Sequence, residues 1–265
     1  MRSFVIGGNW KMQILKVDEA VKAAKAIADA INGLDLTGVD VFIAPSFNAL
    51  YSVGQAIKGS KLKLAAQNMY FRDNGAFTGE ISPDSLLDAG CTYVLLGHSE
   101  RRRIFNEDDA YINQKVKKAL EKGLKPVLCI GETAKERAQG KTDEVNKTQL
   151  AGSLADVLPE QMKNVVIAYE PVWAINNKFL NPDTEIKTAT PEQAEEAHIF
   201  IRKWLVEKYG QEIGGVVPIQ YGGSMNAANA AGLLKIVDIN GGLIGGASLK
   251  AADFKPIIEA AMGNK

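Results

Sequence analysis

Cysteine and histidine are scarce in this chain, and neither sign of charge is in excess. Its 265 residues include two cysteines, Cys91 and Cys129, and two histidines, and 31 Lys and Arg balance 31 Asp and Glu. Two well-separated thiols favour reduced, buried cysteines over a disulfide framework, which predicts a reducing compartment. The balanced charge gives no electrostatic reason to expect nucleic acid or an anionic membrane as a partner.

Long apolar runs and cofactor motifs are also missing. Nowhere do 18 consecutive apolar residues occur, and no apolar signal region precedes Phe4, so we expect a soluble, cytoplasmic protein in which the sequon at Asn146 is idle. The pattern around Gly140-Lys141-Thr142 is not a P-loop, because Lys135 stands where a glycine is needed. Without a GxGxxG fingerprint or a Cys/His cluster, no cofactor and no metal are expected.

Eight short apolar runs recur along the chain, and segments with helical spacing lie between most of them. This alternation predicts an α/β fold, and eight is the strand count of a closed parallel barrel. With 46% hydrophobic residues and about the length of such barrels, the chain is expected to form one domain over residues 1–265. The expected strands are 4–6, 39–44, 62–66, 92–96, 126–130, 165–169, 216–220 and 242–245.

Two of the intervening segments carry clear helical signals. Thr190, Pro191 and Gln193 have the N-cap, first-turn proline and third-position amide of a helix start. The inner stripe of that helix is predicted to be Ala194, Ala197, Ile201 and Leu205. The stripe of the first helix is predicted to be Val17, Val21, Ala24, Ala28 and Ile31, ending at Asn32-Gly33.

Glu170 directly follows the apolar run 165–169, where a carboxylate is either a solvated loop residue or a base at the mouth of a barrel. Its surroundings, Tyr-Glu-Pro-Val-Trp at 169–173 and Lys-Thr-Ala at 187–189, resemble the active-site lid of the triosephosphate isomerase family. Other blocks follow the family's order over essentially the whole chain: Gly8-Asn9-Trp10-Lys11, Gly97-His98-Ser99-Glu100-Arg101-Arg102, Cys129-Ile130-Gly131-Glu132, Tyr221-Gly222-Gly223-Ser224 and Gly245-Gly246-Ala247-Ser248.

The resemblance implies a single (β/α)8 TIM barrel and a cofactor-free isomerase. The expected reaction interconverts dihydroxyacetone phosphate and D-glyceraldehyde 3-phosphate through an enediolate. Two alternatives remain, because the fold hosts many chemistries and the lid is altered. One is a barrel that binds a phosphate ligand with reduced activity, and the other is an isomerase of another small sugar phosphate.

The resemblance also implies roles for individual residues. Glu170 is the expected base and His98 the electrophile, a pairing for which this family is itself the standard case. A carboxylate shielded from water is a stronger base, and a histidine at a helix N-terminus is favoured as the neutral, donating imidazole. Lys11 is expected to stabilise the oxyanion with Glu100 as its carboxylate partner, and Asn9 to position substrate.

Glycine pairs after the last two expected strands resemble the family's phosphate grip. Their backbone N–H groups can approach an anion closely. The expected phosphate-binding residues are Gly223, Ser224, Gly245, Gly246 and, in the lid, Asn176.

The lid departs from the family pattern. Its expected hinges, Pro171-Val172-Trp173 and Lys187-Thr188-Ala189, match, but between them residues 176–186 replace a tip that is usually Gly-Thr-Gly. The turn signal Asn181-Pro182-Asp183-Thr184 predicts a solvent-facing excursion, which should weaken phosphate binding and slow closure.

Other matches concern assembly and packing. Residues 75–80 resemble the loop by which each subunit of a homodimer reaches its partner, with Thr78 at the tip. Cys129 and His198 are expected to be structural. Asn240 stands where the family has an aspartate that pairs with the arginine matching Arg202, so that pair should be weaker here.

Overall fold

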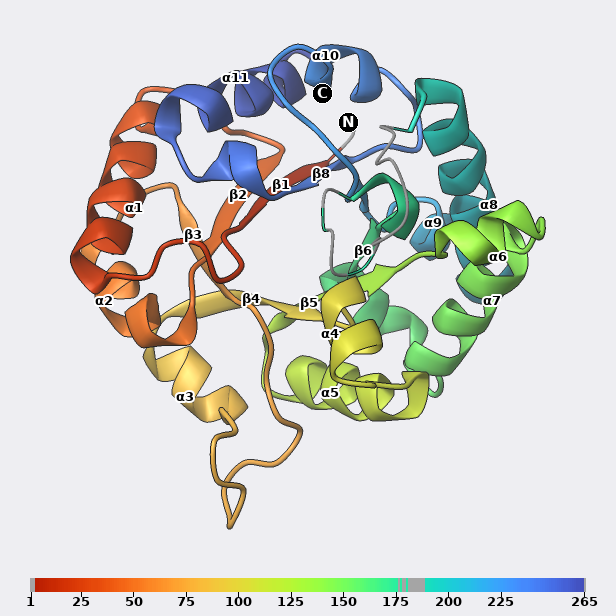
Figure 1. Ribbon diagram of the computed structural model, residues 1–265, viewed down its shortest axis with the longest axis horizontal. Coiled ribbons are helices and arrows are strands. Elements are labelled where there is room, and N and C mark those ends of the chain that lie inside the picture. Colours follow the sequence, from red (N-terminus) through yellow and green to blue (C-terminus); the bar gives the residue numbers. More distant parts are fainter. Residues whose placement is uncertain (1–2, 176, 178–179, 181–188, 265) are drawn as a thin grey trace.

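The computed structural model describes residues 3–175, 177, 180 and 189–264, which form a closed barrel of eight parallel strands ringed by helices (Figure 1). The strands pair in chain order, and β8 closes the barrel against β1. Both the α/β prediction and the implied TIM barrel are confirmed. The strands are β1 (Phe4–Asn9), β2 (Val39–Ala44), β3 (Lys63–Ala66), β4 (Cys91–Leu96), β5 (Lys125–Ile130), β6 (Val166–Tyr169), β7 (Ile219–Tyr221) and β8 (Gly241–Ile244).

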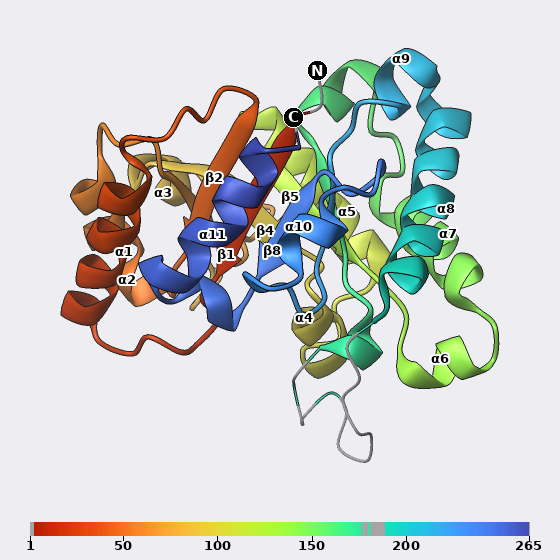
Figure 2. The same cartoon turned by 90° about the horizontal axis from the view of Figure 1, so that it is seen from above.

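Helices cover the outside of the barrel. They are α1 (Val17–Ile31), α2 (Phe47–Ile57), α3 (Pro83–Asp88), α4 (Ser99–Ile104), α5 (Asp109–Glu121), α6 (Ala134–Ala138), α7 (Thr142–Ser153), α8 (Pro191–Tyr209), α9 (Gln211–Gly214), α10 (Ala230–Leu233) and α11 (Ala251–Met262). Three 3₁₀ turns accompany them: η1 (Pro159–Asn164), η2 (Val172–Ala174) and η3 (Gly246–Ser248). In Figure 2, α4 lies at one end of the barrel, and both chain ends lie at the other.

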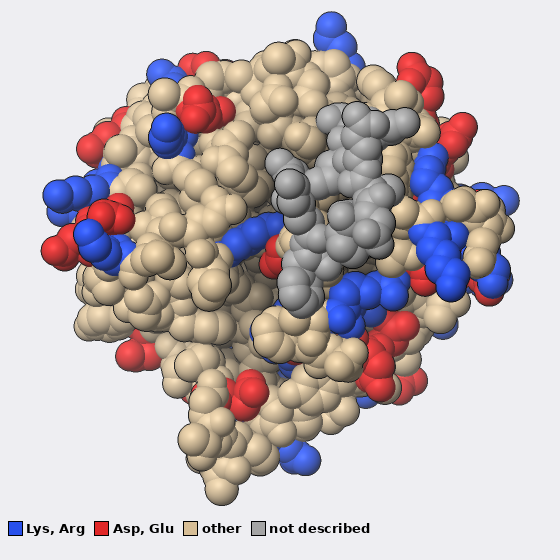
Figure 3. Space-filling model, in the orientation of Figure 1, with Lys and Arg blue, Asp and Glu red and all other residues tan. Residues whose placement is uncertain are grey.

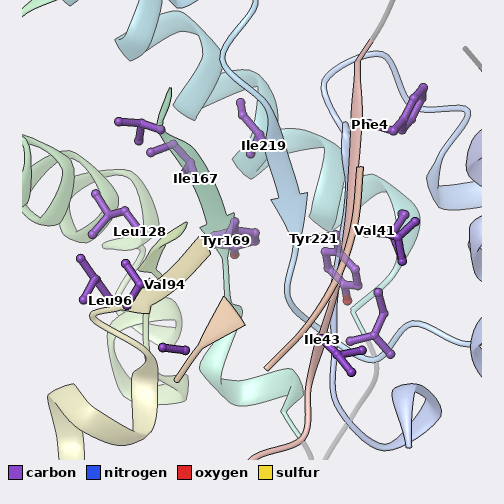
Figure 4. Close-up of a cluster of buried hydrophobic side chains, with 14 of the residues drawn as sticks. Phe4, Val41, Ile43, Val94, Leu96, Leu128, Ile167, Tyr169, Ile219 and Tyr221 are labelled. Carbon is purple, nitrogen blue, oxygen red and sulfur yellow. The ribbon is translucent and has the colours of Figure 1, made fainter. Parts of the chain in front are cut away.

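Side chains along each strand point alternately into the barrel and out toward the helices, which produces two apolar cores. In β1, Val5 points into the barrel, whereas Phe4 and Ile6 point out toward the helices. The inner core includes Phe42 stacked on Tyr93, with ring centroids 4.8 Å apart. The outer core, shown in part in Figure 4, holds the buried strand residues against the helices. The barrel is therefore filled, and a ligand can enter only at its ends.

Polar side chains close the amino-terminal end of the barrel. Asp40, at the start of β2, accepts hydrogen bonds from Tyr93 and Lys63, and Lys125 lies 3.8 Å away. Burial of Asp40 opposes its charge, but these hydrogen bonds and the two lysines keep its pKa below the usual range. This end is thus held by an ionic cluster, which leaves the carboxyl-terminal end for a site.

Strand β7 is shorter than predicted, because it begins at Ile219 rather than at residue 216. Pro218 has no N–H to donate to a sheet, and Val216 is 69% exposed. β8 begins one residue earlier than predicted, and β1 continues to Asn9 through a glycine pair that gives no apolar signal.

The two predicted helices are confirmed in position, but the buried face predicted for α1 is partly wrong. α8 begins at Pro191 behind a complete Thr190–Gln193 capping box, and its four predicted inner residues are buried. In α1 the predicted stripe is rotated: Val17 and Val21 are only half-buried, whereas Ala20 and Ile27 face the core. The reason is that α1 packs against α2 and α11 as well as the barrel, which shifts its buried face.

Arg202 links α8 to the end of α9 and to the segments that precede β7 and β8. Its guanidinium donates to the carbonyls of Gly214 and Val217, to Asn240 Oδ1 at 2.8 Å and to Asp238 Oδ1 at 3.0 Å. Asn240 therefore accepts a hydrogen bond from Arg202 without carrying a charge, and Arg202 makes its ion pair with Asp238 instead. Whether the Arg202–Asn240 pair is weaker than an Arg–Asp pair stays a prediction.

Both cysteines are free and buried. None of the helices within the described part of the chain is long and apolar enough to cross a membrane. The same residues contain no group of three or more His, Cys, Asp or Glu arranged to hold a metal ion. On the face seen in Figure 3, charges of both signs are interspersed.

Candidate active site

Glu170 leaves the end of β6 and is 97% shielded from solvent, since its relative exposure is 3%. Its backbone N–H donates to Ile130 O at 2.7 Å, which continues the pairing of β6 with β5. Glycines directly after both neighbouring strands, β5 and β7, allow this placement. A Cβ on Gly131 would stand 1.8 Å from Glu170 O, and one on Gly222 would stand 2.8 Å from Glu170 Cγ.

The Glu170 carboxylate is held by two groups at the end of β4. Oε1 lies 2.9 Å from His98 Nε2, and Oε2 accepts a 2.9 Å hydrogen bond from the backbone N–H of Ser99. A strand end and a helix start thus fix both oxygens of one buried carboxylate.

His98 is the N-cap of α4 and is 5% exposed. Its Nδ1 accepts a 3.2 Å hydrogen bond from the backbone N–H of Glu100. A backbone N–H can only donate, so Nδ1 carries no proton and the ring is the neutral tautomer with its hydrogen on Nε2. His98 therefore presents an N–H toward Glu170.

Lys11 follows β1 in a left-handed backbone conformation with φ of 51°. Asn9 stabilises this turn, because its Oδ1 accepts the Lys11 N–H at 3.0 Å. The Lys11 ammonium lies 2.8 Å from Glu100 Oε1. Burial alone would raise the pKa of Glu100, but the Lys11 ammonium and the hydrogen bonds that Glu100 accepts outweigh it and keep that pKa below its usual value.

One pocket of about 290 Å³ is lined by most of the predicted site residues. Asn9, Lys11, His98 and Glu170 line it together with Gly223, Ser224, Gly245 and Gly246. A Cβ on Gly245 or Gly246 would meet nothing within 4 Å, so packing does not require these two glycines. Their backbone lies open to the pocket, which is small enough to select a small ligand.

The first predicted hinge is firmly bound to the barrel. Trp173 Nε1 donates to Glu132 Oε1 at 2.8 Å, the Val172 N–H donates to Glu132 O at 3.1 Å, and the Arg137 guanidinium lies 4.5 Å from the Trp173 ring centre. Pro171 and Ala189 are buried. Asn176, Lys187, Thr188 and the turn 181–184 lie outside the described residues.

Thr78 lies in the protruding segment between β3 and α3, visible at the bottom of Figure 1, and is exposed. Three residues near the site have roles that local sequence patterns did not reveal. Gln67 donates to the carbonyls of both Lys11 and Ala44, Glu132 binds Tyr169 and Trp173, and Ser99 supplies its backbone N–H to Glu170. Glu132 and Ser99 belong to family-like motifs and Gln67 follows an expected strand, but their partners are distant in sequence.

Known proteins resemble the chain over nearly its whole length. The family model described as triosephosphate isomerase matches residues 4–261. Triosephosphate isomerases of Chlorobium phaeovibrioides and Carboxydothermus hydrogenoformans are 47% and 48% identical, covering 98% and 99% of this chain and 100% of each relative. That of Chlorobaculum tepidum is 49% identical over 96% of this chain and 99% of its own. The chain belongs to the triosephosphate isomerase family.

Proposed function

We propose that this enzyme interconverts dihydroxyacetone phosphate and D-glyceraldehyde 3-phosphate at the pocket between Glu170 and Gly245. The observation that carries the proposal is the 2.9 Å pairing of a buried carboxylate with a neutral imidazole at the open end of the barrel. One group accepts a proton while the other donates a hydrogen bond, which is what an aldose–ketose isomerisation requires.

In the proposed reaction, Glu170 removes a proton from the hydroxymethyl carbon of dihydroxyacetone phosphate. The electrons of that C–H bond form the carbon–carbon double bond of the enediolate, and negative charge moves to the carbonyl oxygen. The Nε2–H of His98 and the ammonium of Lys11 stabilise this oxygen. The hydroxyl proton on the first carbon must also pass to this oxygen, a transfer that His98 is proposed to relay through Nε2. Return of the carbon-bound proton from Glu170 to the neighbouring carbon then produces the aldehyde, so atoms and charge balance without an external reactant.

The phosphate group is proposed to bind at the glycine-rich part of the pocket lining. The open backbone at Gly245 and Gly246, with Gly223 and Ser224 beside it, supports this location. Asn176 is proposed to add a backbone contact from the lid. The two hinges, residues 171–173 and 187–189, are proposed to let the lid close over the phosphate and exclude water.

We further propose that the enzyme is a homodimer in which Thr78 reaches the partner's site. Exposed large apolar side chains in the segment after β1 and in α2 support a covered surface: Met12 is 83%, Leu15 69% and Tyr51 59% exposed. Gln67, directly after β3, hydrogen-bonds the carbonyls of Lys11 and Ala44 and so links the ends of β1, β2 and β3.

A cytoplasmic location is proposed because both cysteines are free and buried. Burial raises the pKa of Cys91 to about 12 and that of Cys129 well above its usual value, which keeps both thiols protonated and unreactive. A domain extent of residues 1–265 is also proposed.

A coupled assay with D-glyceraldehyde 3-phosphate tests the activity, with Glu170→Gln as the matched variant. Glutamine keeps the shape of the side chain but cannot accept the proton, so kcat should fall roughly 10²- to 10⁴-fold. Circular dichroism should show an unchanged fold. A near-parental rate would remove Glu170 as the base.

The same assay separates the alternatives. A parent that binds a triose phosphate without turnover would support a phosphate-binding barrel. Turnover of a different small sugar phosphate at a higher kcat/KM would support the other isomerase.

A further inference from the structure

We infer that Asn177, in the segment that replaces the usual short lid tip, is a positioning residue for the Lys11–Glu100 pair. The inference rests on the proposed isomerase function. It concerns one side chain particular to this chain's lid, and it gives the beginning of the inserted segment a role at the site.

The contact is a direct hydrogen bond. Asn177 Nδ2 donates to Glu100 Oε1 at 2.9 Å, and the same oxygen receives Lys11 Nζ at 2.8 Å. One carboxylate oxygen is therefore shared by the lid and by the pocket lysine. The Asn177 side chain thus turns toward the site.

The orientation of the Asn177 amide is fixed by its own turn. The Leu180 N–H donates to Asn177 O at 3.1 Å and also lies 3.3 Å from Asn177 Oδ1, and the Asn177 N–H donates to Ile175 O at 2.8 Å. Because Oδ1 accepts from Leu180, the NH₂ group must be the end that faces Glu100. A Gly-Thr-Gly tip would offer no side-chain amide here.

The consequence for Lys11 follows from the geometry of its partner. Glu100 is 24% exposed at its side chain and is faced by Lys11 from the loop after β1 and by His98, whose Nδ1 lies 3.6 Å from Glu100 Oε2. With Asn177 holding Oε1, the carboxylate cannot rotate freely. Its oxygen then directs the Lys11 ammonium to one place in the pocket wall.

Removing the amide should affect turnover through Glu100 alone. We expect Asn177→Ala to lower kcat/KM roughly fivefold, the worth of one ordinary hydrogen bond. The loss should appear in kcat more than in KM, because the oxyanion develops in the transition state. Leu180→Ala, which retains the backbone bonds of the same turn, is the matched control and should leave kcat/KM within twofold of the parent.

The pH profile distinguishes this role from a general loosening of the lid. Protonation of Glu100 would release the Lys11 ammonium, so it is expected to contribute to the acidic limb of kcat/KM. Donation by Asn177 favours the charged form of Glu100, so its removal should move that limb to higher pH. Asn177→Asp should move the limb further, because a second carboxylate faces the first. In a Glu100→Gln background, Asn177→Ala should change kcat/KM by less than twofold.

The side-chain ¹³C shift of Glu100, followed against pH in the free protein, reports the same contact without turnover. A higher titration midpoint in Asn177→Ala is the expected result. An unchanged midpoint and acidic limb, or an equal effect of Asn177→Ala in both backgrounds, would overturn the inference. If the parent turned over no triose phosphate, the proposed function would fail, while the ¹³C titration would still decide the contact.

Discussion

His198 lies fully buried between the rings of Tyr169 and Tyr221, and burial lowers its pKa from 6.5 to about 4. Its Nδ1 lies 2.7 Å from Ala194 O, so the neutral ring donates there. This agrees with the structural role predicted for it. The unfolded chain has no such burial and binds the proton at a higher pH.

The resulting stability contribution is fully present above pH 6.5 and is lost as the pH falls toward 4, because the unfolded state then binds more protons. From the two pKa values the loss is on the order of 3 kcal/mol. Urea unfolding between pH 7 and pH 4.5 measures it. His198→Phe should lose less stability over this range than the parent, and parallel pH profiles would contradict the assignment.

Asn146 has no exposed surface, and neither its Oδ1 nor its Nδ2 has a hydrogen-bond partner among the residues that the structure describes. A glycan could not reach it, which supports an idle sequon. Leucine places the same number of heavy atoms in the same branched arrangement, so Asn146→Leu should raise the free energy of unfolding by about 1–3 kcal/mol. Denaturant titration checks this. Lys147→Leu, on the exposed side of the same helix, should change stability by less than about 0.5 kcal/mol.

Glu170 and His98 could be found from the sequence because each follows an apolar run and belongs to a contiguous motif. Asp238 could not, since nothing near it in the chain shows that Arg202 lies 3.0 Å away. Gln67 is similar, because its two acceptors come from the ends of other strands. Local patterns thus place the groups that carry the chemistry, and the contacts that hold them depend on the closed barrel.

Among the helices, α8 has the most complete start. Thr190 Oγ1 accepts from the Gln193 N–H at 3.3 Å, and Gln193 Oε1 accepts from the Thr190 N–H at 3.0 Å. This capping box stands directly after the second lid hinge. Thr190→Ala should lower the free energy of unfolding by about 1 kcal/mol. Thr190→Ser keeps the acceptor and should stay near the parent, so equal losses in the two variants would show that the cap contributes little.

The ends of helices and strands could be predicted where a capping residue or a proline determines them. Pro191 and Thr190 fix the start of α8 from sequence alone, and the start of β7 could have been placed by Pro218. The turned face of α1 was not predictable in this way. It depends on α11, which lies more than two hundred residues later in the chain.

The whole assembly can be tested at Thr78. If this exposed side chain enters a pocket of a second subunit, Thr78→Arg should weaken association through overpacking and an unpaired charge. Sedimentation at micromolar concentration should show a dimeric parent and a larger monomer fraction in the variant. Thr148→Arg, on the exposed side of α7, is the control and should remain dimeric. A fully active monomeric parent would contradict the dimer.

At position 11, the left-handed backbone and the contact with Glu100 favour different residue types. Glycine and asparagine tolerate a φ of 51° best, and relief of such a conformation is worth on the order of 1 kcal/mol. Neither residue carries the ammonium that reaches Glu100. In a library of all twenty residues at position 11, a screen for heat resistance should enrich glycine and asparagine. A selection in which growth requires the isomerase activity should enrich lysine. The two selections would then favour different residues at this one position.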